Sequence, residues 1–193
     1  MVVVTIMHSR ALDRNPVLRD LLQVGGSMKR PDCLFDPAAG LLRAEQFQIA
    51  YATNDIERAC ECFREQYGIR EFRRLAGPMR TGGHIHVELA WVGSTMYELI
   101  TAEGPGSELF TQRLPRSEFA IRHHHLGFLI HSDRQWRALL DEIERRHWTL
   151  ASVGHTPGFM RSCFVDVPAL GHYLEYLFPE PAGLAFFEAV PAS

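Results

Sequence analysis

The sequence contains an internal repeat, which limits the fold more than any other feature of the chain. The segment around Gln48 matches the segment around His125, 77 residues later. The same offset relates Met96–Ile100 to Tyr173–Leu177, so Glu98 matches Glu175, and the two polar positions of each copy are 50 residues apart. An offset that is kept at both ends of a unit indicates a duplicated module.

Each copy predicts the same order of elements, β-α-β-β-β. In the first copy, alternation predicts a strand at Gln46–Thr53, with Gln48 on one face and Phe47 on the other. Asn54 is the expected N-cap of the following helix, with Glu57 completing a capping box. The remaining strands of this copy are expected at Ile69–Leu75, His84–Val92 and Thr95–Thr101.

The second copy begins with a predicted strand at Arg122–His131 and a helix at Asp133–His147, for which Ser132 is the N-cap. Three further strands are expected at Trp148–Val153, Phe159–Val165 and His172–Phe178. A single unit would leave one face of its sheet bare. Two units can pair to form a curved mixed sheet around a central cavity, with the helices outside. The predicted fold class is therefore α+β, with two tandem βαβββ modules.

The repeat divides the chain into five parts: an N-terminal extension (1–44), a first module (45–106), a linker (107–121), a second module (122–179) and a tail (180–193). The extension contains a short expected helix at Val17–Val24 and an alternative translation start at Met28. The tail is apolar, and we expect it to pack back on the modules. Its apolar character, together with apolar sheet edges, favours a homodimer.

The composition excludes several classes of partner. A net charge of −3 and a pI of about 6.4 provide no overall attraction to nucleic acid or to an anionic membrane. No apolar run approaches the roughly 18 residues that a membrane span needs. The first residues are too short a stretch for a secretory signal, and the four cysteines lack paired-motif spacing. We therefore expect reduced thiols, a cytoplasmic protein and a small-molecule substrate.

The four repeat-related polar residues predict a metal site. Taken alone, a histidine in an apolar strand is more often a hydrogen-bonded core residue than a ligand. Together, Gln48, Glu98, His125 and Glu175 would converge if the first and last strands of both modules line the cavity. Two buried carboxylates are costly without a cation. One imidazole, two carboxylates and one amide oxygen suit a divalent ion such as Zn, Ni, Co, Mn or Fe, which would act as a Lewis acid.

These residues resemble those of a known superfamily. The paired βαβββ units, with His125-Leu-Gly-Phe opening one copy and Gly171-His-Tyr-Leu-Glu175 closing it, are similar to the vicinal oxygen chelate superfamily over about residues 46–178. This is the glyoxalase, bleomycin-resistance and extradiol-dioxygenase group. The resemblance implies metal ligands from the first and last strands of each unit, which here are Gln48, Glu98, His125 and Glu175.

The order Gln, Glu, His, Glu is similar to the ligand set of animal glyoxalase I. For that enzyme the resemblance implies that one glutamate ligand leaves the metal and moves a proton between adjacent carbons through an enediolate. The second half also looks like methylmalonyl-CoA epimerase, although the first-half ligands of that family are His and Gln. The resemblance thus implies lyase, isomerase or epimerase chemistry, with Glu175 transferring the proton and Glu98 opposite it.

Two alternatives belong to other functional classes. A protein of the same fold can bind a hydrophobic small molecule without a metal, as resistance proteins do. An extradiol dioxygenase would need two histidines and one glutamate on iron, and Gln48 stands where one histidine would be.

Further polar residues have two interpretations each. His84 and His86 share a strand face with Glu88, so His86 could act as a catalytic acid or base if that face lines the cavity. His123 is expected to share a face with His125, and His124 to point the opposite way. A basic group could meet an anionic substrate tail or form a solvated surface; it comprises Arg64, Arg70, Arg73, Arg74 and Arg80.

Overall fold

The computed structural model describes residues 31–193, so the predicted helix at Val17–Val24 and the alternative start at Met28 lie outside the described residues. Residues Cys33–Ser193 form one folded unit. The first module consists of β1 (Glu45–Thr53), α2 (Ile56–Tyr67), β2 (Arg73–Pro78), β3 (His84–Val92) and β4 (Thr95–Glu103). The second consists of β5 (Ile121–Leu129), α4 (Asp133–Arg145), β6 (Leu150–Thr156), β7 (Met160–Val167) and β8 (His172–Pro179).

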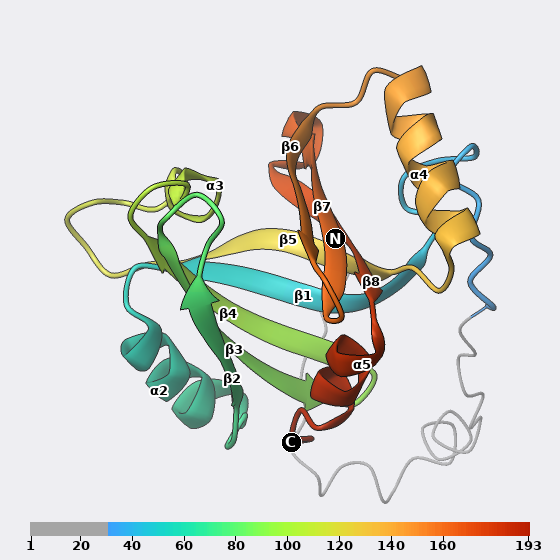
Figure 1. Ribbon diagram of the computed structural model, residues 1–193. Coiled ribbons are helices and arrows are strands. Elements are labelled where there is room, and N and C mark those ends of the chain that lie inside the picture. Colours follow the sequence, from blue (N-terminus) through green and yellow to red (C-terminus); the bar gives the residue numbers. More distant parts are fainter. Residues whose placement is uncertain (1–30) are drawn as a thin grey trace, which may run out of the picture. The chain divides into compact units, whose positions relative to one another are not determined.

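The described strands form one mixed sheet in the order β2-β3-β4-β1-β5-β8-β7-β6. Within the modules, β1 is parallel to β4 and β5 is parallel to β8, while β1 and β5 join the modules in antiparallel fashion. Figure 1 shows β1 and β5 side by side in the middle, with the outer strands of each module curving away from them. The predicted α+β fold with two tandem βαβββ modules is confirmed.

The two long helices each bury one apolar stripe against the sheet. In α2 this stripe is Ile56, Ala59, Cys60 and Phe63, and in α4 it includes Trp136, Leu139 and Ile143. Ser132 caps α4 as predicted, because its side chain accepts a hydrogen bond from the Gln135 amide. Among residues 31–193, no helix is long and apolar enough to cross a membrane.

The N-cap prediction for α2 is wrong by one residue. Asp55, rather than Asn54, accepts a hydrogen bond from the Arg58 amide. The Asn54 side chain instead donates to the carbonyls of Pro115 and Glu118 and accepts from the Ala120 amide. Asn54 therefore fixes the linker before β5, and this long-range contact takes it away from the helix end.

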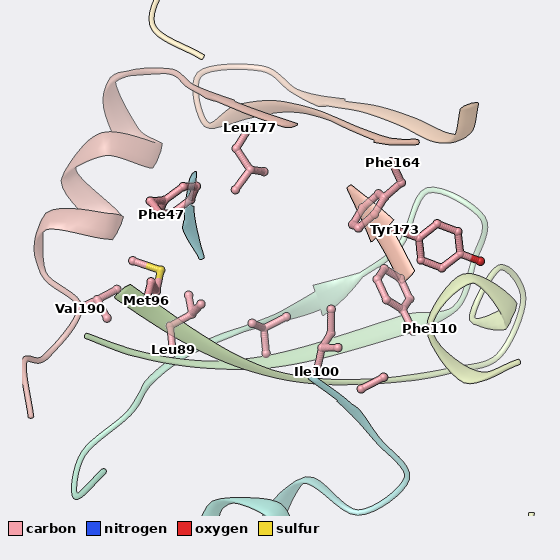
Figure 2. Packing of buried hydrophobic residues seen from close by; sticks show 11 residues of the cluster. Phe47, Leu89, Met96, Ile100, Phe110, Phe164, Tyr173, Leu177 and Val190 are labelled. Carbon is pink, nitrogen blue, oxygen red and sulfur yellow. The ribbon is translucent and has the colours of Figure 1, made fainter. Parts of the chain in front are cut away.

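The concave face of the sheet carries the largest apolar cluster. Figure 2 shows side chains of the two modules facing each other across it, with Leu177 and Phe164 opposite Leu89 and Ile100. The linker forms a short helix, α3 (Glu108–Thr111), whose Phe110 packs into one end of this cluster. The tail forms α5 (Pro181–Glu188), followed by Val190, which packs into the other end. The tail packs on the modules as expected.

The β1–β5 pairing contains two β-bulges at equivalent positions of the repeat. The register places Phe47 as an extra residue in β1 and His124 as an extra residue in β5, and these residues are 77 positions apart. A bulge interrupts alternation, so two successive side chains can point to the same face. Phe47 accordingly packs in the concave-face cluster. The prediction that Phe47 and Gln48 point to opposite faces is therefore wrong.

The second bulge also reverses two histidine predictions. His124 lies against Phe110, Phe164 and Tyr173 of the concave-face cluster. His123 instead contacts Tyr51, which packs with α2, and His172. The face that His123 was expected to share with His125 thus belongs to His124.

Candidate metal centre

Three of the four predicted ligands meet on the concave face. Their ligand atoms all lie within 4.8 Å of one another, and Glu98, His125 and Glu175 are buried. The Nε2 atom of His125 is 3.3 Å from Oε2 of Glu98 and 2.9 Å from Oε2 of Glu175. These residues come from β4, β5 and β8, so the cluster spans both modules. The structure thus brings together three of the four residues that the repeat predicted to converge.

Gln48 lies on β1, at the same level of the sheet. It pairs with Gly127, and Gly127 pairs in turn with Glu175 on the next strand. The side chain is 2% exposed, and its Nε2 lies 3.9 Å from the sulfur of Met96. Its Oε1 has no hydrogen-bond partner among the described residues. A buried acceptor without a donor is unfavourable, so this oxygen is suited to an added cation.

Small residues between the ligands let them approach. A Cβ atom on Gly127 would lie 2.4 Å from Oε1 of Gln48, so a larger residue there would displace Gln48. Ala50 occupies the repeat-equivalent position, 77 residues earlier, and pairs with both Glu98 and His125. In each module, therefore, a residue with little or no side chain lies between two polar ones.

The carboxylates determine the charge of His125. Burial alone would lower the pKa of this histidine, but the interactions with Glu175 and then Glu98 raise it to about 9. Burial also raises the pKa of Glu175, partly offset by the attraction of His125. Near neutral pH, one imidazolium thus faces two carboxyl groups in a site with little solvent. Two buried carboxyl groups beside one histidine form an acidic cluster that a bound cation would stabilise.

The donor set therefore fits a divalent metal ion. Glu98 and Glu175 offer carboxyl oxygens, His125 an imidazole nitrogen, and Gln48 an oxygen that lacks a donor. Oxygen and nitrogen donors without a thiolate suit borderline-to-hard ions. The Glu98 and Glu175 side chains are 8% and 10% exposed, whereas His125 is fully buried. The solvent contact of these three side chains is therefore at the two carboxyl groups.

The structure does not bring His86 to this site. In the β3–β4 register, Leu89 pairs with Glu98 and shares its face, so His86 points to the other face. There its Nε2 lies 2.8 Å from Glu88, a buried carboxylate that also binds Arg74 at 2.7 Å. Arg74 reaches Glu57 of α2 as well. The interpretation of His86 as a catalytic acid or base is therefore wrong, because its strand face is opposite the cluster and the side chain belongs to an ion-pair network beneath α2.

Several arginines of the predicted basic group contact other residues of the same chain. Arg64 donates to the carbonyl of Arg70 and lies over the ring of Phe72, and Arg73 lies over the ring of Phe186. With Arg74 in the network beneath α2, these side chains do not form a single free basic surface.

Two residues of the site were missed by sequence reasoning. Gly127 makes room for Gln48, and His124 forms a hydrogen bond with His125, with 2.8 Å between their Nδ1 atoms. Burial, followed by the nearby charge of His125, lowers the pKa of His124 to about 3, so this ring is neutral. The repeat offset pairs His124 with Phe47 and Gly127 with Ala50, and this correspondence was a signal that could have marked both residues.

Comparison of the sequence with models of protein families finds no match, and comparison with curated proteins finds no significant one. Solved structures, however, match. Methylmalonyl-CoA epimerase from Mycobacterium tuberculosis aligns with a TM-score of 0.53 at 13% identity, covering 82% of this chain and 97% of that one. A methylmalonyl-CoA epimerase in complex with methylmalonyl-CoA and NH4+ aligns with a TM-score of 0.52 at 16% identity, covering 72% and 96%.

The chain has the vicinal oxygen chelate fold. A variant of Streptomyces coelicolor methylmalonyl-CoA epimerase, in complex with 2-nitronate-propionyl-CoA, also aligns with a TM-score of 0.52 at 16% identity, covering 72% of this chain and 96% of that one. At such identities the likeness shows the vicinal oxygen chelate fold alone. The chemistry of this chain has to be argued from its own residues.

Proposed function

We propose that this protein is a metal-dependent enzyme that moves a proton at a carbon next to a carbonyl group, as glyoxalases and epimerases of this fold do. One observation carries the proposal. Three polar side chains from repeat-related strands, those of Glu98, His125 and Glu175, meet on the concave face, and the buried Gln48 lies at the same level of the sheet. The two buried carboxyl groups and the unpartnered Gln48 oxygen both favour a bound cation. Gln48, Glu98, His125 and Glu175 would hold the ion.

A divalent ion held there supplies Lewis acidity, which stabilises negative charge on a carbonyl oxygen of the substrate. The protein residues do the rest. Glu175 is the proposed base, because burial raises the pKa of its carboxyl group and so makes its carboxylate a better proton acceptor. Glu98, whose Oε2 approaches the same Nε2 atom of His125 as Glu175 does, is proposed to take or return the second proton.

The surroundings of the two carboxylates favour a small, largely apolar reacting group. Phe164 pairs with Glu175 across the sheet, and Tyr173 and Leu177 flank Glu175 along β8. Ile100 and Met96 flank Glu98 in the same way along β4. This apolar lining would limit water near the reacting carbon and strengthen electrostatic interactions with the substrate.

The first test is elemental analysis after reconstitution with Zn, Ni, Co, Mn or Fe, for the wild-type chain and for Glu98→Gln. We expect one ion per chain for the wild type and a lower content for the variant. A wild-type content near zero after reconstitution would refute the metal proposal. It would instead favour the metal-free binding of a hydrophobic small molecule that the sequence left open.

The second test is catalytic. Candidate substrates are glutathione hemithioacetals and methylmalonyl-CoA. The reaction is monitored by the incorporation of deuterium from the solvent at the carbon next to the carbonyl. Glu175→Gln keeps the shape of the side chain but cannot take a proton, so we expect turnover to fall by at least ~100-fold, as is usual for loss of a general base. His86→Gln, on the other face of the sheet, is the matched control and should keep its activity. Full activity in Glu175→Gln would rule out its assigned role.

A further inference from the structure

The residue before His125 has an unusual environment for a histidine. His124 is 2% exposed and packs against three rings, those of Phe110, Phe164 and Tyr173, with centroid distances of 5.3, 6.0 and 5.1 Å. The equivalent bulge position of the first module is Phe47. In the first module, therefore, a phenylalanine ring without polar atoms fills this position. The nitrogens of His124 need a separate explanation.

Both nitrogens of His124 have a partner. Nε2 lies 2.9 Å from the carbonyl oxygen of Leu109, and Nδ1 lies 2.8 Å from Nδ1 of His125. A carbonyl only accepts, so Nε2 of His124 must donate. A hydrogen bond between two Nδ1 atoms needs one donor and one acceptor, and a singly protonated His124 carries its proton on Nε2. Nδ1 of His124 is therefore the acceptor, and Nδ1 of His125 is the donor. This order leaves Nε2 of His125 directed at Glu98 and Glu175.

We propose that His124 is a positioning residue, which holds His125 as the Nδ1–H tautomer and so reserves its Nε2 as a metal ligand. The inference rests on the proposed function only for the identity of what Nε2 binds. The chain of hydrogen bonds begins at Leu109 in α3, and the bulge in β5 places both rings on one face. Gln48, the matching ligand, has no tautomer to select, which agrees with the phenylalanine before it.

A substitution that removes the Nδ1 acceptor of His124 would leave the buried Nδ1–H of His125 without a partner. The ring would then rotate or change tautomer, because an unsatisfied buried donor is unfavourable. Partners of this kind behind a metal-bound histidine typically change metal affinity by 10–100-fold. We therefore expect His124 to matter for metal binding far more than for folding.

Two variants separate the roles of the ring and of its nitrogen. His124→Phe keeps an aromatic ring, as at Phe47, but removes the acceptor. His124→Asn removes most of the ring but keeps an acceptor near the Nδ1 position. We expect His124→Phe to weaken zinc binding about 10–100-fold in competition titrations with a chromophoric chelator, and His124→Asn to recover much of the loss. His123→Phe, one residue away on the other face, is the matched control and should bind as the wild type does.

A spectroscopic readout does not depend on any variant. Imidazole ¹⁵N NMR of the metal-free wild type should show His124 with its proton on Nε2, and the zinc-loaded protein should show a hydrogen-bonded proton on Nδ1 of His125. A proton on Nδ1 of His124 would overturn the inference, as would wild-type zinc affinity in a folded His124→Phe. If the wild type binds no metal, the proposed function fails, while the tautomer of His124 still tests the hydrogen-bond order separately.

Discussion

The close contact between Gly127 and Gln48 makes Gly127→Ala an informative substitution. The added Cβ would lie 2.4 Å from Oε1 and 2.8 Å from Cβ of Gln48, whereas optimal contacts of carbon atoms are at about 3.5–4.0 Å. Oε1 can rotate away, but the Cβ atom of Gln48 is fixed to its strand. Relief of the overlap therefore requires β1 and β5 to move apart by about 1 Å at this pair.

Two opposing effects determine how much Gly127→Ala changes the free energy of unfolding. Overpacking of this kind typically destabilises by about 1–3 kcal/mol. Gly127 does not have a positive φ, so alanine also reduces the entropy of the unfolded chain, which stabilises by about 0.4–1 kcal/mol. We expect a net loss of about 1–2 kcal/mol, which corresponds to a decrease in Tm of roughly 2–8 °C for a chain of this length.

The assay is a double-mutant cycle by urea unfolding of the metal-free protein. Gln48→Gly removes both contacting atoms, so Gly127→Ala should be neutral or slightly stabilising in that background. The coupling between the two sites should then be about 1–3 kcal/mol. An equal loss from Gly127→Ala in both backgrounds would refute the reasoning, because the overlap with Gln48 would not be its cause.

Two further predictions concern protons. Since the pKa of His125 is raised to about 9, a metal ion must displace its proton at lower pH. Metal affinity should thus rise about tenfold per pH unit between pH 7 and 8, and calorimetry in buffers of different ionisation enthalpy should detect about one released proton per ion; release of none would contradict the assigned charge. Arg145 and then Arg146 hold the pKa of Glu142 at about 2, below its ordinary 4.5. That stabilisation is present above pH 4.5 and is lost as the pH falls towards 2, so the unfolding free energies of wild type and Glu142→Gln should converge on acidification. A constant difference would contradict this.

The sequence predicted much of the site because duplication and alternation are local patterns. The 77-residue offset identified Gln48, Glu98, His125 and Glu175 without any knowledge of the fold. The predicted bounds of β3, His84–Val92, are those of the structure. Apolar stripes at helical spacing, together with the Ser132 cap of α4, were likewise sufficient to predict the two long helices.

The failures share one physical cause, which is that they depend on residues far away in the chain. Alternation shows that His84, His86 and Glu88 share a face, but only the register with β4 decides that this face lies beneath α2. Asn54 has the right side chain for an N-cap, but contacts with residues 115–120 occupy it.

The sequence by itself therefore determined which residues are equivalent in the two modules, and so which four could share an ion. Only the tertiary structure decided how they meet. The bulges at Phe47 and His124 arise in the pairing of two strands whose equivalent residues are 77 positions apart, and each brings a second side chain onto the concave face. Side-chain direction after a bulge depends on the partner strand, and a pattern read along one strand does not contain that partner.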